Sequence, residues 1–458
     1  MQTALAEEGF SPTLDISEHS RPPKPRPGLE LALAGLVVLM FPASMSTVFG
    51  SLGAYVSTLV TILAITGILR VKPSFQEFRS LFPFFIVALI VLSTGTAATM
   101  RTYDWSYLRG TPVQWSAFLS VTMLAGLWQL RCGEPVRWAY GMLWASSVVS
   151  LIAIGEYAVK DYVGLDRAYS WLTGLRFDDS AYHRSADSFR AIGTMGNPLA
   201  LGTLGAVAGA GALGFYLRDA RIVWPLLLSI NAVAAFASLS RSSWLALIAS
   251  TVITVTVYSL RRGPSWLPII LHVLAGTGIV AAVLLYPPWQ DRIMSRIEES
   301  YAVAVSRVTE LQDSFSYSHR TSAMSDAVDS MLDNPLTLVV GYGLGAENSF
   351  FLGNDATPIT GVASKDVMFA RTFDNSFVTI AYSFGAMGLF WFAHLLFCSF
   401  RCAIGAWVSV PWYVGMLTAA IVCIYFYNAI STPSASYILA VLLGFRFTPD
   451  WQDHDAVA

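Results

Sequence analysis

Long apolar stretches recur along almost the whole chain, and they restrict the fold more than any other feature. A helix of about 20 apolar residues can cross the hydrocarbon layer of a bilayer. Twelve candidate segments approach or reach this length: 29–48, 52–69, 81–100, 112–130, 138–157, 196–217, 222–239, 243–260, 266–286, 375–399, 411–429 and 432–446. Charged residues make up 13 % of the chain, about half of the roughly 25 % found in soluble domains. The sequence therefore predicts an all-α fold, a polytopic membrane helix bundle with about twelve transmembrane helices.

Lysine and arginine residues are unevenly divided between the short connections. Such residues accumulate in the short cytoplasmic loops of membrane proteins. One set of alternate connections holds Arg70, Lys72, Arg79, Arg131, Arg137, Arg218, Arg221, Arg261, Arg262 and Arg401. The opposite set holds Arg101, Arg109 and Arg241. This asymmetry predicts that both termini are cytoplasmic.

The predicted topology divides the chain into one membrane domain, 29–447, and two cytoplasmic tails, 1–28 and 448–458. The first tail is polar and contains proline, as is typical of disordered segments. Two polar inserts, 158–195 and 287–374, then lie outside the cytoplasm. A pore or carrier needs mainly helices and short loops, so the long second insert indicates that the protein carries out chemistry at its outer face.

The second insert is expected to contain short helices. Apolar and charged residues alternate at helical spacing over 291–312, which predicts an amphipathic helix at the membrane interface. Another helix is expected from Arg320 to Leu332, ending before Asn334-Pro335. The glycine-rich run 341–345 follows without the strand–turn–helix context of a nucleotide-binding loop. We therefore expect a tight turn packed against the membrane surface.

Two arginines are predicted at the outer mouths of neighbouring spans. Arg241 joins the seventh and eighth candidate spans with almost no loop. An arginine at the hydrocarbon boundary is costly unless it reaches water or binds an anion, so Arg241 is either a headgroup anchor or a clamp for a diphosphate. Arg190 precedes the turn 193–198, where Asn197-Pro198 opens the sixth span. The N–H groups at such a helix start favour an anion.

Titratable residues inside the predicted spans are few, namely His272, His394 and Glu156. Ion-coupled carriers usually place acidic or histidine relays at mid-membrane and broken helices in matching halves, and neither pattern is evident. This disfavours the competing class, a lipid-linked glycan flippase or solute carrier. Cys398 and Cys402 share a helix face, but we expect no histidine or carboxylate to join them, so no metal is predicted.

Four segments carry a family resemblance when they are taken in order. They are GTMGNPLALG (193–202) after Arg190, SLSRSSWLALI (238–248), HRTSAMSDAVDSMLDNPLTLVVGYGLG (319–345) and FDNSFVTIAYSFGAMGLF (373–390). Their order and spacing resemble the O-antigen polymerase and O-antigen ligase superfamily of bacterial membrane glycosyltransferases. The resemblance covers about 190–399.

The resemblance implies an enzyme of the bacterial inner membrane that needs no metal or other cofactor. Its donor would be a glycan linked to undecaprenyl diphosphate, and its acceptor another glycan, a lipid or a protein, but not a nucleic acid. Arg190 and Arg241 match the family positions that stabilise the diphosphate leaving group. His319, Arg320 and Asn375 are candidate substrate-binding residues; the pair His319-Arg320 could instead be a solvated surface pair.

Asp374 is the candidate general base, because it stands where ligases of this superfamily carry a histidine. A carboxylate can also accept a proton from the acceptor hydroxyl, and this departure favours a polysaccharide polymerase over a ligase. The alternative is that Asp374 only caps the helix that follows.

Overall fold

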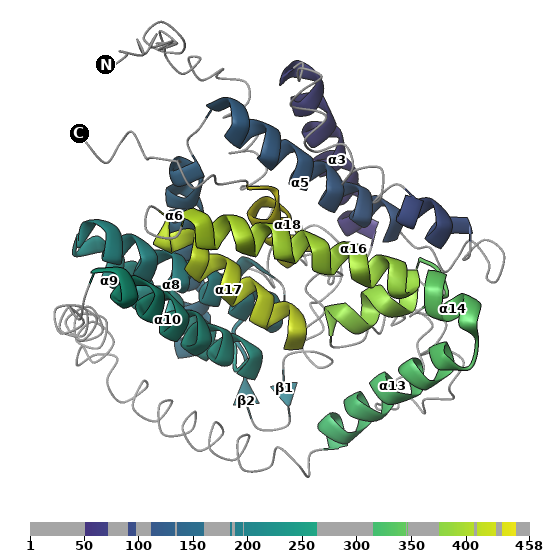
Figure 1. Cartoon of the computed structure of the whole chain (residues 1–458). Coiled ribbons are helices and arrows are strands. Elements are labelled where there is room, and N and C mark those ends of the chain that lie inside the picture. The colour runs from purple at the N-terminus through teal and green to yellow at the C-terminus, as the bar shows by residue number, and fades with distance from the viewer. Residues whose placement is uncertain are drawn as a thin grey trace, which may run out of the picture.

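The computed structural model describes a bundle built almost entirely of helices (Figure 1). The described residues are 51–71, 90–97, 111–132, 135–159, 184–185, 188–195, 197–262, 315–344, 346, 375–406, 410–426 and 433–445. The candidate spans 29–48 and 266–286 and the predicted helix 291–312 lie outside these residues, as do both tails.

Eight described helices coincide with predicted spans. They are α3 (Ser51–Val71), α5 (Thr111–Cys132), α6 (Pro135–Val159), α8 (Pro198–Asp219), α9 (Val223–Ala237), α10 (Arg241–Arg262), α16 (Ser376–Ala406) and α17 (Pro411–Phe426), and α18 (Pro433–Gly444) matches the short last candidate. Four of the described helices are long and apolar enough to cross a membrane: α6, α8, α10 and α16. The prediction of an all-helical protein with several apolar helices is confirmed, whereas the total of about twelve spans stays a prediction.

A small β-hairpin is the one addition to the helical prediction within the described residues. Strands β1 (Arg184–Ser185) and β2 (Ser188–Phe189) pair antiparallel, with Arg184 opposite Phe189. Two-residue strands carry no recognisable alternation of polar and apolar residues, so the sequence gives no signal for them. The hairpin ends immediately before Arg190 and leads the chain into the turn that precedes α8.

Helix α8 lies at the centre of the bundle, between α9, α10 and α17 (Figure 1). Small residues allow these helices to approach closely. Lipid tails are as apolar as the helix surfaces, so helices in a membrane associate through close packing and not through the hydrophobic effect. A Cβ at Gly214 would lie 2.2 Å from the Cα of Trp412, and one at Gly205 would lie 2.7 Å from the carbonyl oxygen of Asn231. Glycine is therefore required at both positions by close backbone contact.

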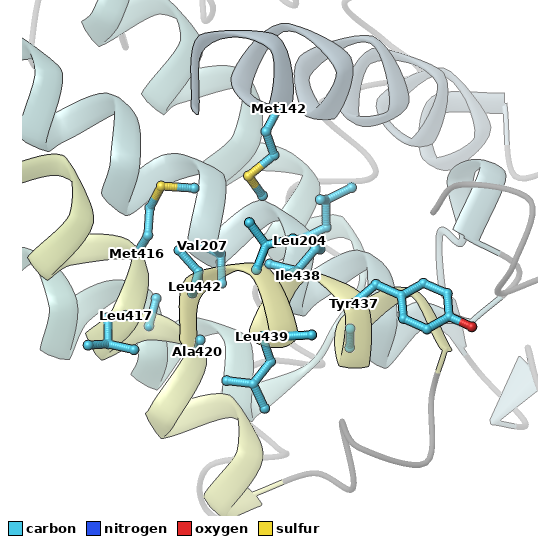
Figure 2. Packing of buried hydrophobic residues seen from close by; sticks show 14 of the residues in the cluster. Met142, Leu204, Val207, Met416, Leu417, Ala420, Tyr437, Ile438, Leu439 and Leu442 are labelled. Atoms are coloured by element: carbon cyan, nitrogen blue, oxygen red, sulfur yellow. The ribbon is translucent and has the colours of Figure 1, made fainter. Parts of the chain in front are cut away.

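Side chains from α6, α8, α17 and α18 meet in one buried apolar cluster, which Figure 2 shows from close by. Among them are Met142, Leu204, Val207, Met416, Leu417, Ala420, Tyr437, Ile438, Leu439 and Leu442. Two hydrogen bonds cross the neighbouring α6–α9 interface: Asn231 accepts one from Ser150 (2.9 Å) and donates one to Ser147 (2.9 Å). These bonds satisfy a fully buried carboxamide and fix the pairing of α6 with α9.

Helix α16 is broken at Gly385, which has a left-handed φ of 65°. The carbonyl groups of Tyr382 and Ser383, just before the break, accept hydrogen bonds from the N–H groups of Tyr342 (2.8 Å) and Gly343 (3.0 Å). Backbone groups released by a helix break must find partners where water is excluded. The predicted glycine-rich turn is thus packed against this helix and supplies the partners that the break requires.

Two short helices lead to this turn. Helix α13 (Phe315–Leu332) begins five residues before the predicted start and ends at the predicted residue. Helix α14 (Pro335–Val340) was not expected. Its N-cap is Asn334, whose side chain accepts a hydrogen bond from Leu336 N at 3.0 Å. Asn-Pro therefore ends one helix and begins the next, because asparagine caps well and proline fits the first helical position.

Candidate active site

The turn between β2 and α8 holds Arg190 against the neighbouring α9–α10 connection. Arg190 Nε donates a hydrogen bond to the carbonyl oxygen of Ser238 at 3.0 Å. One residue later, Ala191 N donates to the carbonyl oxygen of Ala237 at 3.1 Å. Arg190 is partly buried, and its Nε bond holds the side chain against the α9–α10 connection.

The chain then passes through a single turn of 3₁₀-helix, η3 (Gly193–Met195), before α8 begins. Asn197 caps α8: its Oδ1 accepts a hydrogen bond from Leu199 N at 2.8 Å, and Pro198 occupies the first helical position. The predicted helix start at Asn197-Pro198 is confirmed. It directs the positive end of the α8 dipole toward the side of the bundle on which Arg190 lies.

Only Ser238, Leu239 and Ser240 separate α9 from α10. Leu239 takes a left-handed φ of 50°, which is unfavourable for a branched side chain, and it is held there by burial. Trp244 also holds α10 against α9, so that the two helices form a helical hairpin (the α9–α10 hairpin). Its Nε1 donates to Ala235 O at 3.1 Å, and its ring stacks on Phe236 with centroids 5.2 Å apart. The sequence prediction of two helices joined with almost no loop is correct.

Arg241 is the first residue of α10 and is partly buried. A cation at a helix N-terminus opposes the helix dipole and is unfavourable by roughly 0.3–1 kcal/mol unless an anion shares the site. The N-terminal part of α8 also packs against the start of α10 and the connection before it, since a Cβ at Gly202 would lie 2.0 Å from Ser243 Oγ and 2.7 Å from Ser238 Oγ. Two helix N-termini and two arginine-bearing turns are therefore neighbours at this end of the bundle.

Glu156 of α6 lies beneath the Arg190 turn and is 1 % exposed. Its Oε2 accepts hydrogen bonds from Ile192 N at 3.1 Å and from Gly193 N at 2.7 Å. Sequence reasoning placed Glu156 only among titratable residues near the outer end of a span. The available signal for a role of Glu156 was its position as a lone acidic residue in the apolar segment 138–157.

The remaining predicted site residues belong to α13 and to the start of α16. Asn375 is the N-cap of α16: its Oδ1 accepts hydrogen bonds from Phe377 N at 2.8 Å and Val378 N at 3.2 Å. Its substrate-binding role would thus rest on Nδ2. Asp374 lies outside the described residues, as do the side chains of His319 and Arg320, although both of these positions belong to α13.

The cysteine pair in α16 has a histidine neighbour, contrary to expectation. His394 stands one helical turn before Cys398, and its Nε2 lies 3.5 Å from Cys398 Sγ. Neither Cys398 nor Cys402 forms a disulfide. Across the part of the chain that the structure describes, no three His, Cys, Asp or Glu side chains gather closely enough to hold a metal ion.

The two turns bring Arg190, Arg241 and the starts of α8 and α10 to the same end of the bundle. Residues 225–393 match the model of a family described as O-antigen ligase, and no curated protein matches the chain. The matched region runs from α9 into α16 and includes Arg241 and Asp374, whereas Arg190 precedes it. The match confirms the predicted resemblance of this membrane protein to the O-antigen polymerase and O-antigen ligase superfamily.

Proposed function

We propose that the protein transfers an oligosaccharide from undecaprenyl diphosphate to an acceptor hydroxyl at the outer face of the cytoplasmic membrane. We further propose that it acts as a polymerase of surface polysaccharide, in which the acceptor is a second lipid-linked glycan. One contact supports this most directly: the Arg190 Nε bond to Ser238 O, which ties the Arg190 turn to the hairpin that carries Arg241. The O-antigen ligase family match supports transfer of this general kind.

In the proposed reaction the acceptor oxygen attacks the anomeric carbon of the donor. A new glycosidic bond forms, and the bond from that carbon to the diphosphate oxygen breaks. Undecaprenyl diphosphate leaves with the electron pair, and Arg190 and Arg241 stabilise the negative charge as it develops. Asp374 accepts the proton of the acceptor hydroxyl. The reaction as proposed requires no metal.

A ligase is the second candidate, and the description of the matching family favours it. A ligase would use the same donor chemistry and the same arginines, but would deliver the glycan to a lipid or protein. The carboxylate at position 374, where ligases of the superfamily carry histidine, supports the polymerase instead.

Purified protein in lipid, incubated with an undecaprenyl-diphosphate oligosaccharide, separates these possibilities. A ladder of longer lipid-linked products on a gel indicates a polymerase. Transfer to an added lipid or protein acceptor without a ladder indicates a ligase. If neither product forms while the substrate crosses the bilayer, the protein is a flippase or carrier and the transferase proposal fails.

The proposed site requires an outward-facing location, which follows from the predicted multi-pass topology with both termini in the cytoplasm. A single cysteine is introduced at position 355, within the insert 287–374. It should react with an impermeant thiol reagent in cells whose inner membrane is sealed and accessible from outside. Reaction only after that membrane is permeabilised would reverse the topology and place the arginines on the wrong side for exported donors.

A further inference from the structure

Glu156 lies near the C-terminal end of α6, beneath the Arg190 turn, and the proposed reaction leaves it without a role. It shares one face of α6 with Val149 and Ala153, and Gly193 packs on this face: a Cβ at Gly193 would lie 3.2 Å from both Val149 Cγ1 and Val149 O. Gly193 also has a left-handed φ of 53°. The turn therefore sits directly on α6, with the Glu156 carboxylate bonded to its backbone.

Four consecutive residues are held from two sides. Arg190 and Ala191 bond to the α9–α10 side through Ser238 O and Ala237 O. Ile192 and Gly193 bond to the α6 side through Glu156 Oε2. Hydrogen bonds to a charged acceptor are stronger than neutral ones, whereas burying a carboxylate is costly. The carboxylate therefore holds the backbone at Ile192 and Gly193 more firmly than a neutral acceptor would, at the cost of a buried charge.

We propose that Glu156 is a positioning residue for the Arg190 guanidinium. By holding the backbone at Ile192 and Gly193, the carboxylate fixes the 190–193 turn. It thereby fixes the backbone position from which the Arg190 side chain reaches the α9–α10 connection. This inference rests on the proposed function in one respect, namely that Arg190 binds a diphosphate. Glu156 itself does not contact substrate in this scheme; it acts through Arg190.

A double-mutant cycle tests whether Glu156 acts through Arg190. Glu156→Ala should lower the transfer rate constant about 10- to 100-fold, the range expected for the loss of a charged hydrogen-bond acceptor, with a smaller change in KM. In the Arg190→Ala background the same substitution should add less than about 2-fold, because residues that act as a unit are not additive. Glu156→Gln keeps one accepting oxygen and should recover most of the rate.

Ser150→Ala is the matched control. Ser150 is also a buried residue of α6, but its hydroxyl bonds to Asn231 of α9 and not to the Arg190 turn. If loosening of α6 against α9 caused the loss of rate, Ser150→Ala would reproduce it. We expect near-normal transfer from Ser150→Ala, and a small decrease in melting temperature comparable to that of Glu156→Ala. Should Glu156→Ala fail to fold, the cycle is run with Glu156→Met, which keeps the length of the side chain but has no oxygen to accept from Ile192 N and Gly193 N.

Binding of undecaprenyl diphosphate to the full-length protein in nanodiscs distinguishes this inference from the proposed function. Weaker binding in both Glu156→Ala and Arg190→Ala, without further weakening in the double variant, supports the positioning role even if the wild type transfers nothing. Additive losses in rate or affinity, or an equal loss in Ser150→Ala, would overturn the positioning role while transfer by the wild type stands.

Discussion

Two glycine turns connect polar segments to the helix bundle, and they are held by different kinds of partner. At residues 190–193 one partner is a charged side chain, Glu156, which accepts two hydrogen bonds from the turn, and the turn's own Arg190 donates to Ser238 O. At residues 341–344 the partners are backbone groups, contributed by the broken helix α16 and by Gly95, whose carbonyl oxygen accepts from Leu344 N at 3.2 Å. Both turns contain glycine with positive φ.

The difference between the turns separates a structural junction from a candidate chemical one. Backbone pairing satisfies every group involved without adding charge, which is what a helix break inside an apolar layer needs. Buried charges are retained only where paired or where they serve a function. We therefore expect substitutions in the 341–344 junction to affect folding, and substitutions of the arginines near the 190–193 turn to affect transfer.

The largest expected effect comes from filling the backbone junction at Gly385. A Cβ there would lie 2.4 Å from the carbonyl oxygen of Val339, and the φ of 65° is left-handed. Left-handed strain of about 1–2 kcal/mol and overpacking of about 1–3 kcal/mol together should destabilise Gly385→Ala enough to remove most folded protein. The measurements are the yield of monodisperse protein in detergent and its melting temperature.

Gly141→Ala provides the control for this substitution. Gly141 lies within α6, and a Cβ at this position would meet nothing within 4 Å. Alanine also favours a helix over glycine by up to about 1 kcal/mol, so this variant should be at least as stable as the wild type. Equal yields of the two variants would show that the α16 junction tolerates side chains and would remove the structural half of the comparison.

The charged turn should respond in the opposite way. Arg190→Ala and Arg241→Ala should each lower transfer roughly 100- to 1,000-fold, the range seen when a donor to a developing oxyanion is lost, with little change in melting temperature. Lysine should restore only part of the rate at either position, because its ammonium cannot form the bidentate pair. The measurement is single-turnover transfer from the lipid-linked donor.

Arg221→Ala is the matched control for the arginines. Arg221 is well exposed at the α8–α9 connection, with Nε 3.5 Å from the carboxylate of Asp219, and such surface pairs contribute little. Its replacement should leave transfer unchanged. If all three alanine variants kept near-normal rates, Arg190 and Arg241 would be anchors for lipid headgroups and the proposed site would lie elsewhere.

Asp374 tests whether the chemistry extends to the start of α16. Asp374→Asn preserves the size of the side chain but removes the proton acceptor. Transfer should fall about 100-fold, the lower range for general-base catalysis, while donor binding stays close to normal. Nearly full activity would exclude Asp374 as the base and make His319, in α13, the next candidate to replace.

The sequence was informative where one local rule decides the structure. Apolar length predicted the helices, and Asn197-Pro198 predicted the start of α8, because capping and proline preferences act within a few residues. The break at Gly385 and the role of Glu156 were not predictable. Both depend on partners more than 30 residues away, Val339 to Gly343 in one case and Ile192 to Gly193 in the other.

The candidate site shows the same limit. The sequence placed Arg190 and Arg241 at neighbouring helix mouths, and the structure links the two turns that carry them. It could not indicate that the link is made through a backbone carbonyl, because every residue carries one. The sequence offered Asp374 as a possible cap of α16, whereas the structure places the cap one residue later, at Asn375.

The smallest expected effect concerns that cap and sharpens the assignment of Asp374. Asn375→Ala removes the acceptor for Phe377 N and Val378 N, and loss of an N-cap costs about 1 kcal/mol. The melting temperature should therefore fall by a few degrees, while transfer falls less than about 5-fold because helix α16 remains anchored at the 341–344 junction.

Asp374→Asn should show the reverse: a large loss of transfer and no loss of stability. The pair is informative because the two positions are adjacent, so a general disturbance of the helix start would affect both variants alike. If Asn375→Ala instead abolished transfer at an unchanged melting temperature, its Nδ2 group would be the substrate contact, and the polar chemistry at the start of α16 would belong to Asn375 as much as to Asp374.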